Sequence, residues 1–245
     1  MKTKKHLLKP YKKTSAYNYV FTMLKDHIIS GSFSPGDRLP TEIELSKTLG
    51  ISRAATREGL KGLEGVGLIT AVPGNRGGRF VKNIDSGIIV NGLDLLLQTQ
   101  KASFEDLMEA RKDIECITAK KAALNRTDEN LRAMSKVLDL NVDTKEEFDR
   151  RNFELHEIVA LASQNMVLYY MIQAIRKLVF KTYSNIALEE HNIGLVTKTH
   201  YDIYKAIKNR DVDGAEKAMI TDINAYKDLY LEVTKKHELE QGKRK

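Results

Sequence analysis

The chain of 245 residues is long enough for one large domain or two ordinary ones, and its 42% hydrophobic and 30% charged residues are typical of a globular protein with a packed core. Its apolar runs are far too short to cross a bilayer, and we expect no secretory signal because no apolar segment follows the basic N-terminus. Cys116 is the only cysteine, which excludes an intrachain disulfide, so we expect a cytoplasmic protein without membrane association.

The charge is unevenly distributed along the chain. Residues 1–82 carry 15 Lys and Arg against 6 Asp and Glu, a net charge of +9, whereas residues 83–245 carry 25 against 27, a net charge of −2. A strongly basic N-terminal segment followed by a nearly neutral segment predicts that the N-terminal segment contacts a polyanion. We expect residues 1–14 to form a flexible basic tail that adds non-specific attraction to phosphates.

Proline and glycine divide the chain in the same place. All four prolines lie before residue 74, and neither residue type occurs between Gly92 and Gly194. Proline and glycine residues in the N-terminal part favour turns and a hairpin, and their absence after Gly92 favours long helices. We therefore predict four segments after the tail: a small α+β domain over 15–82, a linker over 83–87, an all-helical domain over 88–236 and a polar tail over 237–245.

The first domain has the pattern of a helix-turn-helix. An apolar stripe at helical spacing predicts a first helix over 15–30. Thr41 and Glu44 have the form of a capping box, in which each side chain binds the backbone N–H of the other residue, so a second helix starts after Thr41. A tight glycine-containing turn over 50–52 then precedes a third helix that starts at Arg53.

The third helix and the hairpin after it are the predicted DNA-reading surface. Arg53 and Arg57 lie one turn apart on one helix face, and arginine suits the two acceptors of guanine in the major groove. The hairpin has a glycine-rich tip over 73–79, where Arg76 or Arg79 can meet a phosphate or a narrow minor groove. Two arginines on one helix face, taken alone, can simply form a solvated basic surface. The capping box, the turn and the hairpin wing together favour the interpretation that this face binds DNA.

These residues resemble the GntR family of bacterial transcription regulators, in its FadR-like branch with a C-terminal helical, FCD-type domain. The family segment Pro-Gly-x-x-Leu-Pro-[Ser/Thr]-Glu is matched by residues 35–42, its recognition helix Ser-Arg-x-x-x-Arg-Glu by 52–58, and its wing, with slight shuffling, by 76–81. The resemblance implies a mainly α fold, a winged helix-turn-helix followed by an all-α bundle. It also implies DNA contacts from a set of head residues: Arg38, Thr41, Ser52, Arg53, Thr56, Arg57, Arg76, Gly77 and Gly78.

Some positions depart from the family pattern. Ile43 stands where the family usually has an arginine that contacts DNA, and Ala54-Ala55 replace a small polar pair. We interpret these changes as a different operator sequence rather than a loss of DNA binding. Gly59 and Gly62 also lie inside the third helix, where each costs about 0.5–1 kcal/mol relative to alanine, so we expect this helix to become firm only on DNA.

The second domain is predicted to contain six or seven helices whose apolar faces carry inward-pointing polar groups. Arg111, the pair Asn152 and His156, His200 and Asp222 lie on the apolar stripes of four different helices. Isolated charges are costly to bury, so such groups are normally paired, coordinated or hydrated. The expected helices cover residues 88–99, 103–124, 128–140, 144–162, 165–184, 193–209 and 211–236.

Taken singly, these polar residues have ordinary structural explanations. A histidine on an apolar stripe is usually a hydrogen-bonded core residue, and Arg111 with Glu115 can be a plain i,i+4 pair. Taken together, imidazole, carboxylate and amide oxygen are reasonable ligands for a divalent transition metal, and Arg111 suits a two-pronged grip on a carboxylate.

The family resemblance implies a metal among these residues. Many FadR-like members hold a metal through Asp-x-x-x-His and two further histidines, and the metal helps to bind a small carboxylate. Here Asn152 and His156 match the first pair, His200 the third position, and Asp222 the fourth, where histidine is usual. These four are the expected ligands of an ion such as Zn or Ni, and with Arg111 they form the expected effector site. A metal-free pocket that binds its ligand directly is the alternative.

We therefore expect a homodimeric, ligand-responsive DNA-binding regulator and not an enzyme. The expected mechanism is repression of a catabolic operon, with release from an inverted-repeat operator when a small carboxylate or sugar acid binds. One alternative is a helical metal-dependent hydrolase or lyase fused to a nucleic-acid-binding head, although the sequence contains no Glu-x-x-His, His-Glu-x-x-His or Gly-x-Ser-x-Gly motif. Another is an architectural DNA binder without sequence preference.

Overall fold

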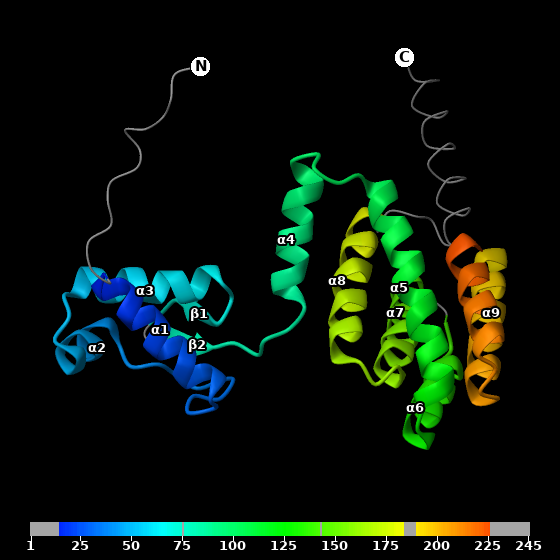
Figure 1. Ribbon diagram of the computed structural model, residues 1–245, viewed down its shortest axis with the longest axis horizontal. Coiled ribbons are helices and arrows are strands. Elements are labelled where there is room, and N and C mark those ends of the chain that lie inside the picture. The colour runs from blue at the N-terminus through cyan, green and yellow to red at the C-terminus, as the bar shows by residue number, and fades with distance from the viewer. Residues whose placement is uncertain (1–14, 75, 143, 184–189, 226–245) are drawn as a thin grey trace, which may run out of the picture. The chain divides into compact units, whose positions relative to one another are not determined.

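The computed structural model describes residues 15–74, 76–142, 144–183 and 190–225, and the chain divides into two compact units, Met1–Ile88 and Ile89–Lys245. The predicted tails and the end of the last predicted helix lie outside the described residues. Across the part that is described, no helix is long and apolar enough to span a membrane. The fold is mainly helical, with one small sheet after the N-terminal helices, which confirms the predicted fold class (Figure 1).

The first unit is a winged helix-turn-helix. Its elements are α1 (Ala16–Ile29), α2 (Glu42–Leu49), α3 (Arg53–Gly65), β1 (Ile69–Val72) and β2 (Gly78–Val81). The two strands pair antiparallel, with Ile69 opposite Val81 and Val72 opposite Gly78. The backbone of residues 36–39 also binds β2, because the N–H of Leu39 donates to the carbonyl of Arg79 at 2.8 Å. The segment between α1 and α2 is thereby fixed against the wing.

Local sequence explains where the two short helices start and stop. The Thr41 hydroxyl accepts from the N–H of Glu44 at 3.2 Å, and the Glu44 carboxylate accepts from the N–H of Thr41 at 2.8 Å, so the predicted capping box is confirmed. Ser52 caps α3 by accepting from the N–H of Ala55 at 3.3 Å. Gly50 ends α2 with a φ of 64°, a left-handed conformation that glycine adopts without steric cost.

Gly59 and Gly62, two of the three glycines in α3, have a packing role that the sequence did not predict. A Cβ atom at Gly59 would lie 2.8 Å from the Cβ of Val20 and 2.9 Å from the carbonyl oxygen of Tyr17. One at Gly62 would lie 3.0 Å from the ring of Phe21. Glycine therefore lets α3 approach α1 closely, and α3 is a continuous helix packed against α1.

The second unit is a bundle of helices. They are α4 (Gly87–Gln98), α5 (Phe104–Asn125), α6 (Asp128–Leu138), α7 (Lys145–Ala162), α8 (Met166–Tyr183), α9 (Glu190–Lys208) and a further helix over 212–225. The observed bounds lie close to the predicted ones. Helix α5 packs against α7, α8 and α9, so it is the central helix of the unit (Figure 1).

Helices α5 and α7 come close together because small side chains face large ones. Leu155 and Val159 of α7 are buried in one cluster with three fully buried alanines of α5. Both helices begin at capping boxes, which satisfy backbone N–H groups of the first turn. This packing fixes two helices that each carry inward polar side chains. The α5 alanines are Ala119, Ala122 and Ala123.

Candidate functional site

Most of the residues predicted to contact DNA lie on the surface of the first unit. Gly77 and Gly78 are partly buried because Arg38 lies over them. Its Nη2 donates to the carbonyl of Gly77 at 2.7 Å, and a Cβ atom at Gly78 would lie 2.7 Å from its Nε. Arg57 Nε lies 3.0 Å from Glu42 Oε2, yet the Arg57 side chain stays 51% exposed. The exposed members of the predicted set are Arg38, Thr41, Ser52, Arg53, Arg57 and Arg76.

Thr56 and Arg79 have structural roles in the head. Thr56 is 0% exposed, and its hydroxyl donates to the carbonyl of Ser52 at 3.1 Å. We expected its side chain to contact DNA, but the structure buries it inside the head. Arg79 Nε lies 2.8 Å from Glu64 Oε1, and its Nη1 lies 3.1 Å from Glu42 Oε1. Arg79 therefore holds the wing against α2 and α3, which leaves Arg76 as the wing arginine available for DNA.

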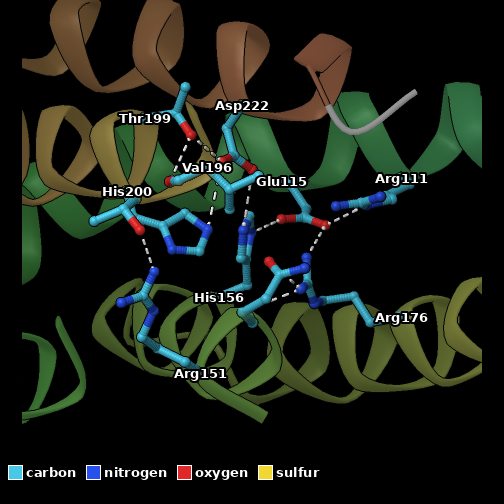
Figure 2. A network of polar contacts seen from close by, with 11 residues as sticks. Arg111, Glu115, Arg151, His156, Arg176, Val196, Thr199, His200 and Asp222 are labelled. Atoms are coloured by element: carbon cyan, nitrogen blue, oxygen red, sulfur yellow. Dashed lines mark hydrogen bonds and ion pairs between the residues drawn. The ribbon is translucent and has the colours of Figure 1, made fainter. Parts of the chain in front are cut away.

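The inward polar residues of the second unit meet in one buried network (Figure 2). They come from α5, α7, α8, α9 and the helix over 212–225, so five helices must pack correctly to assemble it. None of these side chains belongs to a residue that is more than 7% exposed. The members are Arg111, Glu115, Asn152, His156, Arg176, Thr199, His200 and Asp222.

The centre of the network consists of His156, His200 and Asp222. His156 Nε2 lies 3.1 Å from Asp222 Oδ2, and His200 Nε2 lies 3.4 Å from Asp222 Oδ1. Each residue offers one possible ligand atom, and the three atoms lie within 4.8 Å of one another. The hydroxyl of Thr199 donates to Asp222 Oδ1 at 2.5 Å and fixes the carboxylate.

Glu115 connects this centre to two arginines. Its Oε2 accepts a hydrogen bond from Nδ1 of His156, because an ionised carboxylate can only accept. Its Oε1 lies 2.8 Å from Nε of Arg111 and 3.2 Å from Nη1 of Arg176. The contact between Nδ1 and Glu115 orients the His156 ring so that Nε2 points toward Asp222. Histidines that bind a metal through one ring nitrogen commonly donate a hydrogen bond from the other nitrogen to a carboxylate.

The environment keeps both carboxylates charged and His200 neutral. Burial raises the pKa of Glu115, but the charges of His156, Arg111 and Arg176 outweigh it and hold the pKa well below its usual range. Burial lowers the pKa of His200 to about 3, although the neighbouring Asp222 carboxylate acts in the opposite direction. Burial also raises the pKa of Asp222, but its interactions with the two histidines and with Thr199 bring that pKa below the usual range.

The donor atoms at the centre fit a divalent transition metal. Ligands at about 2.0–2.2 Å from such an ion lie roughly 3–3.5 Å from one another, and the two distances to Asp222 fall within this range. Within the ranges that the structure covers, His156 Nε2 and both ring nitrogens of His200 have no hydrogen-bond partner. Buried polar atoms rarely lack partners, so these nitrogens suit a bound cation.

Asn152, the fourth expected metal ligand, has a different role. Its side-chain oxygen accepts from Nη2 of Arg176 at 3.1 Å, and its backbone carbonyl accepts from the same atom at 2.9 Å. The structure therefore brings His156, His200 and Asp222 together and uses Asn152 to position Arg176. Arg111 lies in the network through its i,i+4 bond to Glu115, which was the ordinary structural alternative for this residue.

Sequence reasoning missed three members of the network: Glu115 as a partner of His156, Arg176, and Thr199. The i,i+4 bond between Arg111 and Glu115 is present, but no pattern in the sequence indicates that Glu115 also binds His156. Arg176 was missed although a signal existed, since it lies on an apolar stripe of α8 with Ile172 and Val179.

A small cavity opens at the arginine end of the network. Its volume is about 20 Å³, close to the least that holds one water molecule, and both Arg111 and Arg176 line it with Asn152. Arg176 Nε has no hydrogen-bond partner in the part of the chain that is described. Arg111 and Arg176 both contact the carboxylate of Glu115 here, and Asp149 also lines the cavity.

Comparison with known proteins gives matches for both units. The family described as "Bacterial regulatory proteins, gntR family" matches residues 16–79, and the FCD domain matches residues 106–225. The uncharacterized HTH-type transcriptional regulator YcbG of Bacillus subtilis is 31% identical over 76% of this chain and 77% of its own length. The HTH-type transcriptional repressor NanR of Klebsiella aerogenes is 28% identical over 82% of this chain and 80% of its own.

Two further matches concern regulation and fold. The Glc operon transcriptional activator of Escherichia coli K12 is 29% identical over 78% of this chain and 79% of its own length. The solved structure of a Streptococcus agalactiae GntR protein is similar with a TM-score of 0.61 at 22% identity, covering 86% of this chain and 98% of that one. The structural likeness shows that the two proteins share a fold.

Proposed function

The chain belongs to the GntR family of bacterial transcription regulators and carries a C-terminal FCD ligand-binding domain, and from this premise we propose that a small carboxylate bound in the buried network switches its DNA binding. The observation that carries the proposal is the buried Arg176, which lines a cavity together with Arg111 and whose Nε has no hydrogen-bond partner among the described residues. A buried guanidinium N–H without a partner favours a ligand that accepts from it, and arginine binds carboxylates with two parallel hydrogen bonds.

The proposal includes a divalent metal, such as Zn or Ni, held by His156, His200 and Asp222. When bound, the ion supplies positive charge that attracts the acid. Glu115 orients His156, and Thr199 positions Asp222 for this role. Elemental analysis of the purified protein is expected to find one metal per chain, and the His200→Ala variant should lose it. If the acid still binds with the same affinity after chelation, the metal-free alternative is correct.

On the DNA side, we propose that a homodimer binds an inverted repeat through α3 and the wing and represses a catabolic operon. The exposed Arg53 and Arg57 support the reading of bases, and NanR, which is named a repressor, supports the sign of regulation. The Glc protein is named an activator, so measurement must decide the sign. Acid binding would favour one arrangement of the helices and thereby change the spacing of the two heads.

Sequencing of genomic fragments captured by the purified protein at moderate salt tests the DNA part. A short inverted repeat beside one operon is the expected result, and the reactions encoded there identify the acids to titrate. Capture without a shared sequence, together with an affinity that falls steeply with salt, would instead support the architectural alternative.

We also propose that the network binds its acid without turnover. The family is one of regulators, which supports this, whereas the enzyme alternative requires chemistry at the bound acid. Prolonged incubation of the metal-loaded protein with each acid that binds should leave the acid unchanged by mass spectrometry. Catalytic conversion of any such acid would revive the enzyme alternative.

A further inference from the structure

We propose that the effector site continues outward from the buried network into a groove along α7 and α8, and that the effector is a carboxylate whose tail carries hydrogen-bond donors. This inference rests on the proposed function, because the acidic head of the effector is assigned to Arg111 and Arg176. It adds a place for the rest of the molecule and the chemistry that this place selects.

The cavity inside the network is too small for an organic acid. It has a volume of about 20 Å³, whereas the groove outside has a volume of about 610 Å³. Ligand pockets commonly measure about 300–1,000 Å³, so the groove is large enough for a metabolite. Asp149, Phe153 and Phe180 line both spaces, so the two meet at these three side chains.

Two aromatic rings stand at this junction. The guanidinium carbon of Arg176 lies 5.8 Å from the ring centroid of Phe153, so Phe153 contacts the inner arginine directly. Lys145 Nζ lies 5.8 Å from the ring centroid of Phe180, and Phe180 is 43% exposed. An acid entering from the groove must pass these rings, which also provide apolar contact for the carbon chain behind its carboxylate.

The polar side chains of the groove are mainly acceptors. Lys145 Nζ lies 2.5 Å from Asp149 Oδ2, which pairs these two residues with each other. The remaining charged residues that line the groove are three glutamates and one arginine: Glu146, Glu154, Glu157 and Arg150. Glu157 Oε1 already accepts from Nε2 of Gln173 at 2.6 Å, and burial raises the pKa of Glu157. Ionised Glu146 and Glu154 accept hydrogen bonds and cannot donate them, so the complementary tail carries hydroxyl or ammonium groups.

A second groove is larger but lacks the connection. It has a volume of about 840 Å³ and lies between α4, the segment after it and α8. None of the residues that line it belongs to the network or to the small inner cavity. We therefore assign the effector tail to the groove along α7 and α8.

Three acids with six carbon atoms test the inference: hexanoate, gluconate with its hydroxyl groups, and 6-aminohexanoate with its terminal ammonium group. Isothermal titration of the metal-loaded, full-length protein compares their affinities. At least one donor-bearing acid should bind about tenfold more tightly than hexanoate, since one hydrogen bond to a charged group is worth that much. Whichever of gluconate and 6-aminohexanoate binds more tightly shows whether the groove selects hydroxyl or ammonium groups.

Variants then locate the preference within the protein. In Glu154→Gln/Glu157→Gln, which keeps the shape of the groove, the preference over hexanoate should disappear. The control Glu129→Gln removes an exposed carboxylate of α6 outside the groove and should leave it unchanged. Equal binding of all three acids, or a preference that survives in the double variant, would overturn the inference.

Measuring acetate binding distinguishes a failure of this inference from a failure of the proposed function. If acetate binds in an Arg176-dependent manner while none of the six-carbon acids binds, the groove assignment is wrong and the inner carboxylate site remains. If acetate also fails to bind, the carboxylate site itself is wrong, and the inference is overturned together with the proposed function.

Discussion

At the scale of single residues, Glu115 is the side chain that joins the network together. It contacts Arg111, Arg176 and His156, and all four side chains are almost completely buried. Removing one partner from such a set leaves charges in the interior without compensation, which costs far more than the intact pairs contribute. The network should therefore be intolerant of a neutral residue at this position.

The substitution Glu115→Gln preserves the size of the side chain and removes its charge. We expect it to lower the stability of the second unit by about 3–5 kcal/mol, because two buried guanidinium groups lose their carboxylate. The exposed Glu129→Gln is the matched control and should change stability by less than about 0.5 kcal/mol. Urea unfolding of both variants measures the difference, and equal midpoints would show that the network does not depend on this charge.

The arginines of the head make a second test at this scale. Arg53→Ala or Arg57→Ala should each reduce operator affinity by about 1–3 kcal/mol and relax the sequence preference, since both lie exposed at the start of α3. Fluorescence anisotropy with operator and scrambled DNA gives both quantities. Lys25→Ala, on α1, is a control that removes one positive charge elsewhere in the head. Sequence preference that survives both arginine changes would mean that α3 is not the recognition helix.

At the scale of elements, the helix bounds followed from local signals, whereas contacts between elements did not. Capping residues and breakers act within a few residues, so the starts of α2, α3 and α6 could be read from the sequence. The role of Gly59 depends on the position of α1, and the role of Arg79 depends on two helices that precede it in the chain. A pattern of residue types carries no such information, which is why Gly59 was interpreted as a weakness.

Gly59 gives the prediction for this scale. Gly59→Ala should destabilise the first unit by about 1–3 kcal/mol through overpacking against Val20, despite the higher helix propensity of alanine. Gly65→Ala is the control in the same helix, because a Cβ atom there meets no atom within 4 Å. It should be neutral or slightly stabilising. Thermal unfolding of the two variants decides, and a stabilised Gly59→Ala would contradict the packing role.

At the scale of the whole molecule, function requires that the two units affect each other. The first unit presents cationic side chains for DNA, and the second holds a buried, highly charged network that is built from five helices. The sequence anticipated His156, His200 and Asp222 because each breaks an apolar stripe. It could not reveal that Asn152 turns to Arg176, since that choice depends on α8. An acid bound in the network can influence DNA only by favouring one arrangement of these helices.

The most direct test of this account compares operator release by acid in the wild-type protein and in the His156→Ala/His200→Ala variant. Anisotropy of labelled operator is followed as the acids processed by the neighbouring operon are added to metal-loaded protein. The account predicts that both proteins bind the operator with similar affinity and that the acid changes binding only in the wild type. An unchanged acid response in the double variant, with operator binding intact, would show that the effector site lies elsewhere.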